Sequence, residues 1–284
     1  MMVTTEPMIT LTPLTSADPQ WDRLSAEITP RLPNHISREE LVAHLSFMPG
    51  HYWNHAEEGE IIWHLEAIHD FFKLVSAEDG DPSKPIVRLR HFPLRGFSEI
   101  IVCTWNRQGL FAKITGALAA AGANITEAHA YTRQDNVVMD YFKVVSKIGG
   151  GAVNDIIVEG VITYLRDCLS PLNPLDLRQV IKISHAKPEV PLEKEEPIVL
   201  WDAYSGDEYT QLHVETYDYM GLLYEVSLEL ADADLKIHMA NVCTKNNWAM
   251  DDFLITDMFN RKVTDADRLN EVKNRLMRRL GIFE

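Results

Sequence analysis

The sequence lacks the short motifs of many nucleotide-dependent and hydrolytic enzymes. Its 284 residues contain no GxGxxG, no GxxxxGK followed by Ser or Thr, and no GxSxG. The three cysteines, Cys103, Cys168 and Cys243, lie far apart and form no CxxC, which argues against a disulfide framework and a cysteine metal site. No apolar run approaches the ~20 residues that span a bilayer. We expect no cofactor and no bound metal.

Positive charge is also scarce. The chain has 27 Lys and Arg residues against 42 Asp and Glu residues, which gives a net charge of −15. This charge opposes binding to a phosphate backbone or to an anionic membrane, so we expect neither nucleic acid nor membrane as a partner. The N-terminus has no basic and apolar regions of a signal peptide, which predicts a cytoplasmic protein. The length predicts about two domains.

A tandem repeat with a spacing of 112 residues organises the chain. Pro85-Ile86-Val87 recurs as Pro197-Ile198-Val199, and Gly109-Leu110 recurs as Gly221-Leu222. The same spacing separates four further pairs: Ile125 and Ile237, Ala128 and Ala240, Thr132 and Thr244, Asp140 and Asp252. We therefore predict a duplication of about 60 aligned residues, each copy inside a unit of roughly 90–110 residues.

Each copy begins with the pattern of a β-α-β-β unit. In the first copy we expect a strand at 98–105, a helix from 109 to 122, strands at 124–133 and 137–145, a helix at 153–169 and a strand at 179–184. The order βαββαβ predicts an α+β fold of the ferredoxin-like type, an antiparallel sheet with two helices on one face. The second copy repeats this order to a helix at 265–280 and has no closing strand. We expect strands at 86–90 and 198–201 to fill a sheet edge.

The remaining segments set the domain boundaries. Residues 1–36 are rich in Thr and Pro and are expected to be extended, and residues 37–80 form a helical arm. Ser37 with Glu40 predicts a capping box for a helix to 47, and a helix at 57–76 carries an apolar stripe that packs on the sheets or on a second subunit. Unit 1 covers 84–184, a Pro-rich charged linker covers 185–196, and unit 2 covers 197–284.

The turn between the first strand and the first helix is the repeated loop with a clear physical task. Gly109 and Gly221 stand at a helix N-terminus, where free N–H groups form an anion site suited to a carboxylate. A nearby Asn or Asp can receive an ammonium group, so the loop could hold a free α-amino acid. The alternative is that both glycines only permit tight packing of the helix on the sheet.

These residues resemble the ACT domain, a small βαββαβ module that senses amino acids. The resemblance rests on Asn106-Arg107-Gln108-Gly109-Leu110-Phe111 and on Gly122-Ala123-Asn124-Ile125. More narrowly, residues 46–284 resemble the C-terminal region of the PII uridylyltransferase/uridylyl-removing enzymes. That family's nucleotidyltransferase and hydrolase domains have no counterpart here, so the resemblance implies a regulatory protein and not an enzyme.

The resemblance places an amino acid, with glutamine favoured, at an interface between the two ACT units. The ligand-binding candidates are Thr104, Asn106, Arg107, Gln108, Gly109, Leu110, Asn124, Ile125, Asp218, Gly221 and Leu222. The proline usual in the loop is replaced by Gln108 and Met220, and Tyr219 and Lys236 depart further in copy two. Copy one is therefore the better ligand site, with a regulatory target protein as the implied partner.

Two other functions compete with amino-acid sensing. The departures in the loops suggest a scaffold whose ACT units serve assembly without a ligand. Separately, open sheet edges favour a homodimer, although a pair of ACT units within one chain would satisfy one edge. The third hypothesis is a metal-dependent hydrolase remnant in the front segment. It rests on these residues: His51, His55, His64, His69 and Asp70. Too few helices precede the first strand to supply further ligands, so histidines with structural partners are the better interpretation.

Overall fold

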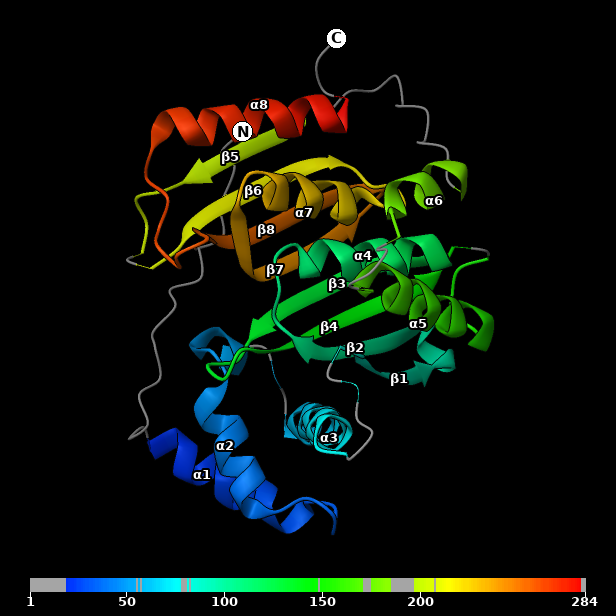
Figure 1. The fold of residues 1–284 in the computed structure, drawn as a ribbon, viewed down its shortest axis with the longest axis vertical. Coiled ribbons are helices and arrows are strands. Elements are labelled where there is room, and N and C mark those ends of the chain that lie inside the picture. The colour runs from blue at the N-terminus through cyan, green and yellow to red at the C-terminus, as the bar shows by residue number, and fades with distance from the viewer. Residues whose placement is uncertain are drawn as a thin grey trace.

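A computed structural model describes residues 19–281, except 55, 57, 78–80, 82, 148, 171–174, 185–196 and 207. Residues 1–18 and the expected linker 185–196 therefore lie outside the described residues. Along the long axis of the molecule lie a helical arm at the bottom of Figure 1, a first sheet with its helices in the middle, and a second sheet with its helices at the top.

Unit 1 is built on a four-stranded antiparallel sheet. Its strands are β1 (Ile86–Phe92), β2 (Phe97–Trp105), β3 (Ala123–Thr132) and β4 (Val137–Ser146). They stand in the order β1-β2-β4-β3, and β1 pairs with β2 from Ile86 opposite Cys103 to Phe92 opposite Phe97. The strand that precedes the repeat thus fills the sheet edge, as expected. Helices α4 (Leu110–Ala121) and α5 (Asp155–Leu169) cover one face.

Unit 2 repeats this arrangement. Its strands are β5 (Ile198–Asp202), β6 (Thr210–Tyr217), β7 (Leu235–Lys245) and β8 (Trp248–Asp257), in the order β5-β6-β8-β7. Its helices are α7 (Leu222–Asp232) and α8 (Ala266–Leu280). The expected α+β class, with two ferredoxin-like units on antiparallel sheets, is confirmed.

The strand expected at 179–184 is wrong, because this segment is a helix, α6 (Leu177–Ser184). The place of a closing strand beside β2 is taken by β1. Leu177 and Ile181 stand four residues apart, on one face of a helix, and both are buried. The backbone N–H of Arg178 donates to Asp176 Oδ1 at 3.0 Å, which satisfies one of the open N–H groups at the helix start.

The spacing between the two copies changes from 112 to 111 residues in the hairpin between their last two strands. Five residues separate Thr132 from its partner Val138, whereas four separate Thr244 from Ala249. Val102 therefore pairs with Asp140, and its counterpart Val214 pairs with Asp251. The structural counterpart of Asp140 is Asp251, and the equivalence with Asp252 expected from a constant spacing is wrong.

The glycines at the repeated helix start are required by backbone conformation. Gly109 precedes α4 with φ of 66°, and Gly221 precedes α7 with φ of 93°. Residues with a Cβ atom rarely adopt this left-handed region. Gly122, with φ of 88°, ends α4 as predicted.

The helical arm covers the other face of the first sheet. It contains α1 (Pro19–Ile28), α2 (Arg38–Phe47) and α3 (Glu58–Val75), with short 3₁₀ turns at Thr29–Arg31 and Gly50–Asn54, and a third turn at Pro93–Arg95 joins β1 to β2. Helix α1 contradicts the expectation that residues up to 36 are extended. The predicted capping box is present, since Ser37 and Glu40 exchange two hydrogen bonds.

The apolar stripe of α3 packs on the first sheet, which is one of the two partners expected for it. Ile61, Leu65 and Ile68 are at most 3% exposed and share a core cluster with Ile101 and Cys103 of β2. Neighbouring residues of β2 point to opposite faces, so Ile100 and Val102 belong to the other core, under α4 and α5. Strand β2 is thus buried on both faces.

The two units lie side by side. Edge strand β3 lies next to edge strand β7, and α4 lies next to α7. The helix-side core is continuous across this junction, because one cluster contains Ile114 and Leu118 of α4 together with Val226 and Leu230 of α7. The junction between the units is therefore part of the core.

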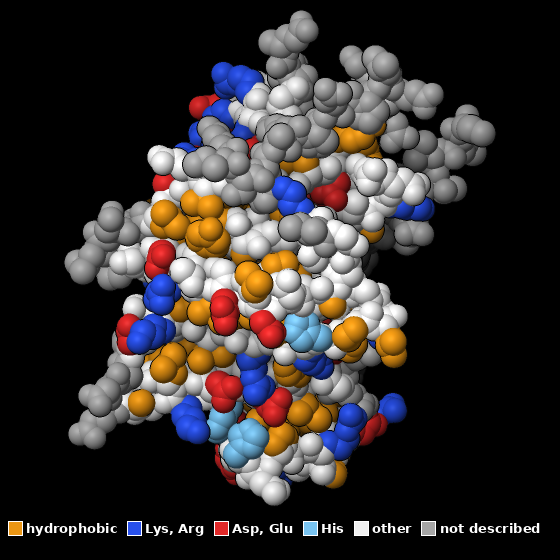
Figure 2. All heavy atoms as spheres, turned by 90° about the vertical axis from the view of Figure 1, so that its right-hand side faces the viewer, with side chains coloured by type: hydrophobic (Ala, Val, Ile, Leu, Met, Phe, Trp, Pro, Cys, Tyr) orange, Lys and Arg blue, Asp and Glu red, His pale blue; other side chains and the backbone are white. Residues whose placement is uncertain are grey.

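No helix in the described part of the chain is long and apolar enough to cross a membrane. On the face shown in Figure 2, Lys and Arg side chains alternate with Asp and Glu side chains, and hydrophobic side chains are exposed only in small patches. The excess negative charge is therefore not collected into one block on this face.

Substitution of Gly116 tests the packing of α4 against α7. A Cβ atom on Gly116 would lie 2.8 Å from Cδ2 of Tyr224 and 2.9 Å from Cδ1 of Leu177. We expect Gly116→Ala to lower the free energy of unfolding by about 1–3 kcal/mol, because the overpacked ring must shift. Urea unfolding measures the loss. The control is Gly59→Ala, where a Cβ atom meets nothing within 4 Å, and a comparable loss there would contradict the packing explanation.

Candidate functional site

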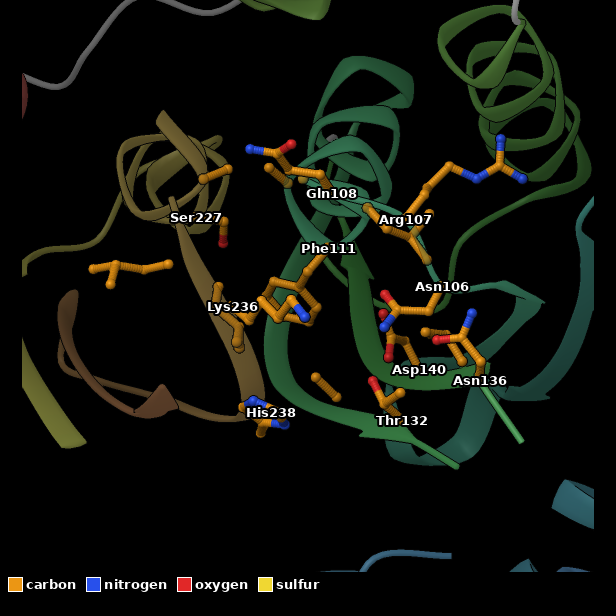
Figure 3. Close-up of a pocket in the computed structure, with 18 of the residues that line it drawn as sticks. Asn106, Arg107, Gln108, Phe111, Thr132, Asn136, Asp140, Ser227, Lys236 and His238 are labelled. Carbon is orange, nitrogen blue, oxygen red and sulfur yellow. The ribbon is translucent and has the colours of Figure 1, made fainter. Parts of the chain in front are cut away.

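A cavity of about 500 Å³ lies at the junction of the two units. Unit 1 contributes the loop after β2, the start of α4 and the hairpin between β3 and β4. Unit 2 contributes α7, the start of β7 and the turn after β8. Figure 3 shows Asn106, Thr132, Asn136 and Asp140 on one wall and Ser227, Lys236 and His238 on the other. The repeated loop therefore faces the opposite unit.

Asp140 provides a buried carboxyl group in the cavity wall. It stands in the middle of β4, opposite Val102 and Ala130, and is 2% exposed. Its Oδ1 accepts a hydrogen bond from the backbone N–H of Tyr131 at 3.2 Å. Burial raises the pKa of this carboxyl well above its ordinary value, since a lone charge there is poorly solvated. A cation entering the cavity would favour its ionised form.

The start of α4 offers hydrogen-bond donors to the same cavity. The backbone N–H of Leu110 bonds to the carbonyl of Arg107 at 3.1 Å. Helix geometry leaves the N–H groups of Phe111 and Ala112 without intrahelical acceptors, and both residues line the cavity. The helix dipole adds a positive potential at this end. The cavity thus combines a carboxyl group on β4 with an anion-binding helix start.

The opposite wall comes from unit 2 and contains both apolar and polar side chains. Lys236 Nζ donates to Oδ1 of Asn260 at 3.1 Å, and His238 Nε2 bonds to the Thr256 hydroxyl at 2.8 Å. Burial and the neighbouring Lys236 lower the pKa of His238 to about 4, so its imidazole is neutral at pH 7. This wall therefore presents one ammonium group beside neutral hydrogen-bonding groups.

The predicted residues of the first loop all border the cavity, but two of their side chains form bonds elsewhere. Asn106, Arg107, Gln108, Gly109 and Leu110 all line it. The Arg107 side chain nevertheless points toward α5, where Nη1 donates to the carbonyl of Leu169 at 3.4 Å. Gln108 Nε2 donates across the junction to Asp234 Oδ1 at 2.9 Å.

Thr104 does not line the cavity. It is fully buried, and its hydroxyl has no hydrogen-bond partner among the described residues. The structure therefore places this predicted ligand residue inside the sheet and outside the cavity wall.

The other predicted residues surround a second, much smaller hollow of about 20 Å³. These are Asn124, Ile125, Asp218, Gly221 and Leu222. The Asn124 side chain forms a hydrogen bond with the Asp218 carboxylate, which joins the two units. Asn124 thus lies opposite the loop of copy two, and its expected place beside Asn106 and Gly109 is wrong. Each loop meets the strand of the other copy.

Two residues important to the cavity were not among the predicted ligand residues. Asp140 appeared only as a member of the repeat. It lies far from the loop in the sequence, although the sheet brings both to the same cavity. Lys236 appeared as a departure of copy two, yet it stands opposite the loop of copy one. Each loop faces a strand of the other unit, and this could have been inferred only from the way in which the units pair.

The hairpin between β3 and β4 joins the cavity to the helical arm. Arg133, Gln134 and Asn136 line the cavity, and the carbonyl of Asn136 accepts from the backbone N–H of Asn106 at 2.9 Å. On the arm side, the backbone N–H of Gln134 donates to the carbonyl of Phe47 at 2.9 Å. The buried Arg133 guanidinium lies over the ring of Phe47, 5.4 Å from its centroid.

Arg133 also begins a directed chain of hydrogen bonds in the arm. A guanidinium can only donate, so Nη1 of Arg133 donates to Nδ1 of His44 at 3.3 Å. His44 then donates from Nε2 to the Tyr52 hydroxyl at 3.3 Å, and that hydroxyl donates to Nδ1 of His64 at 2.8 Å. His64 carries its proton on Nε2, which has no partner among the described residues.

The other candidates for a metal site are held apart in the described part of the arm. His69 Nδ1 bonds to Glu40 Oε1 at 2.6 Å, and Asp70 Oδ2 lies 3.2 Å from Nε of Arg88. His55 and the side chain of His51 lie outside the description. No group of three or more His, Cys, Asp or Glu side chains in the described residues is arranged to hold a metal ion. His64 and His69 have structural partners.

The resemblance to tandem ACT-domain proteins is confirmed by comparison with known proteins. Residues 205–279 match the family described as "ACR family N-terminal ACT domain". The chain is 31% identical over 196 residues to a bifunctional uridylyltransferase/uridylyl-removing enzyme of Azospirillum brasilense, which covers 66% of the chain and 20% of the relative.

A second relative matches a longer part of the chain. It is the bifunctional uridylyltransferase/uridylyl-removing enzyme of Gluconobacter oxydans, 29% identical over 236 residues, which make up 80% of the chain and 23% of the relative. The chain therefore spans about a fifth to a quarter of the length of these curated relatives.

Solved structures provide distant matches. The match to aspartate kinase from Synechocystis covers 65% of the chain and 27% of the kinase chain, with 14% identity and a TM-score of 0.38. The match to a putative glycine cleavage system transcriptional repressor covers 66% of the chain and 92% of the repressor chain, with 14% identity and a TM-score of 0.23.

The pH dependence of the free energy of unfolding tests the burial of His64. Burial lowers the pKa of this histidine to about 3, so the folded chain keeps it neutral while the unfolded chain protonates it below pH ~6.5. The contribution of His64 to the free energy of unfolding should therefore fall as the pH decreases from about 6.5 toward 3, by at most about 1.4 kcal/mol per pH unit. Urea unfolding at pH 7.5, 6.5 and 5.5 measures this dependence.

The comparison of wild type with His64→Gln isolates this group. The buried carboxyls of Asp140 and Asp251 have raised pKa values and give a pH dependence of opposite sign, which both proteins share. We expect the stability difference between the two proteins to shrink as the pH falls. A difference that stays constant from pH 7.5 to 5.5 would contradict a neutral, buried His64.

Proposed function

We propose that this chain is a non-catalytic regulatory protein that binds a free amino acid in the cavity between its two units and thereby changes its interaction with a target protein. The observation that carries the proposal is the buried carboxyl of Asp140 in a cavity that also receives the start of α4. These two features suit the opposite charges of a zwitterion. The match of residues 205–279 to an ACT domain supports the same ligand class.

The proposed orientation follows from charge. The ligand's ammonium group lies toward Asp140, where the side chains of Asn106 and Thr132 supply further oxygen acceptors. Its carboxylate accepts from the N–H groups of Phe111 and Ala112. An ammonium beside Asp140 would compensate the cost of ionising a buried carboxyl, which makes the interaction stronger than one at the surface.

The ligand's side chain would extend toward unit 2. Glutamine is favoured by the resemblance to the uridylyltransferase/uridylyl-removing enzymes. Its amide both donates and accepts hydrogen bonds, and the neutral His238 and Asn260 on this wall offer matching partners. The neutral imidazole adds no second positive charge to that of Lys236.

The hairpin between β3 and β4 is the proposed route from the ligand to the target protein. The same hairpin lines the cavity with Asn136 and is held by the arm through Gln134 and Arg133. A ligand that fits one position of the hairpin better than another shifts the arm by that difference in affinity. The surface offered by the arm then differs between the free and the bound protein.

One observation favours a ligand-independent scaffold as the second candidate function. The Gln108 side chain bonds to Asp234 across the junction, and the core is continuous between the units, so the pairing of the units needs no ligand. In that case, the affinity for the target protein would be the same with and without amino acids.

Isothermal titration calorimetry with each of the twenty amino acids tests the proposed function. We expect saturable binding of at least one of them, with glutamine the first choice, and a rise in the thermal unfolding temperature at saturation, because the ligand binds only the folded chain. An intact fold that gives no heat and no thermal shift with any amino acid would reject amino-acid sensing.

Asp140→Asn tests the proposed ammonium site. Replacing the carboxylate by an amide removes a charge-assisted hydrogen bond, and we expect the affinity to fall by about 10- to 100-fold. The matched control is Asp252→Asn, at the position that constant sequence spacing would equate with Asp140, and it should leave the affinity unchanged. Equal effects of the two substitutions on the dissociation constant would contradict the assigned role.

A further inference from the structure

The two ligand positions implied by the duplication consist of equivalent residues but differ greatly in volume. The cavity pairs the loop of copy one with Ser227, Ala231 and Lys236, and the second hollow pairs the loop of copy two with their counterparts Thr115, Ala119 and Asn124. The cavity measures about 500 Å³ and the hollow about 20 Å³. One of the two equivalent positions is therefore closed.

A large side chain distinguishes the second position from the first. Tyr224 occupies the position in α7 that Ala112 occupies in α4, and each lines its own site. Tyr224 is 6% exposed, and its ring lies against Gly116, where a Cβ atom would come within 2.8 Å of it. The absence of a side chain at Gly116 thus makes the space that the ring fills.

Helix α6 covers the same position from outside. Leu177 and Ile181 are 3% and 7% exposed, and Cγ2 of Ile181 lies 3.1 Å from the point where Gly221 would carry a Cβ atom. Gly221 precedes α7 as Gly109 precedes α4. At Gly109, the corresponding neighbour is the Cβ atom of Ala231, at 3.6 Å. The start of α7 is therefore packed under the apolar face of α6, whereas the start of α4 opens into the cavity.

One carboxyl group of the second hollow is engaged with neighbouring side chains, and the other is buried beside it. Asp218 bonds to Asn124 and accepts from the Thr244 hydroxyl at 3.1 Å. Asp251, the counterpart of Asp140, is 1% exposed, and its Oδ1 has no hydrogen-bond partner among the described residues. A space of this size holds about one water molecule and no amino acid.

We infer that the chain binds one amino acid per duplicated pair of units, and that Tyr224 and α6 occupy the second ligand position themselves. This inference rests on the proposed function. It assigns to Tyr224 the role of excluding ligand from a site that otherwise keeps its carboxyl group and its helix start. The protein then responds to its ligand at one position, without cooperativity between two.

Calorimetric stoichiometry on the full chain tests the inference, with L-glutamine as the probe, or with whichever of the twenty amino acids binds in the panel above. We expect one ligand per chain for wild type. Asp251→Asn should leave both the stoichiometry and the dissociation constant unchanged, whereas Asp140→Asn weakens the binding. Tyr224→Ala, which copies the residue at Ala112, should raise the stoichiometry toward two, with circular dichroism to verify its fold.

The outcomes separate the inference from the proposed function. Two ligands per wild-type chain, or a loss of one binding event in Asp251→Asn, would overturn the inference and leave amino-acid sensing intact. A folded Tyr224→Ala variant that still binds one ligand would overturn the role assigned to Tyr224. The absence of binding by every amino acid would instead reject the proposed function, and the inference with it.

Discussion

The side-by-side packing of the two units is the constraint on which the other features depend. Because β3 meets β7 and α4 meets α7 over a continuous core, each loop that follows the first strand of a copy is held against the strand of the other copy. The cavity has one wall from each unit and does not exist in either unit alone. The ligand position is thus a property of the pairing, and any change in the pairing changes the cavity.

The same packing explains which features could be predicted from the sequence. Local signals were sufficient for α4, because Gly109 and Gly122 bracket a helical pattern, and for α2, where Ser37 and Glu40 form the capping box. The α3 stripe correctly indicated a helix that packs on another element. These features depend on residues close together in the chain, whose physical preferences agree with their final environment.

The features that could not be predicted depend on contacts between distant residues. The segment at Leu177–Ser184 has the composition of a strand, yet the edge it would have joined is already filled by β1, and it packs as a helix over Gly116 and Gly221. Asn124 and Lys236 were assigned to the wrong loops because each faces the loop of the other unit, and the sequence of a single copy does not indicate this pairing. Asp140 was matched to Asp252 because a gap of one residue in a turn is invisible to a constant spacing.

That missing residue has a consequence for the symmetry of the molecule. The chain has one helical arm and two copies of this turn, and the arm contacts the copy in unit 1. The longer turn of unit 1 carries Arg133 and Gln134, which form hydrogen bonds with the arm, whereas the residue that corresponds to Arg133 in unit 2 is the exposed Lys245 at the end of β7. The arm therefore contacts a turn that differs in length and in side chains from its counterpart in unit 2.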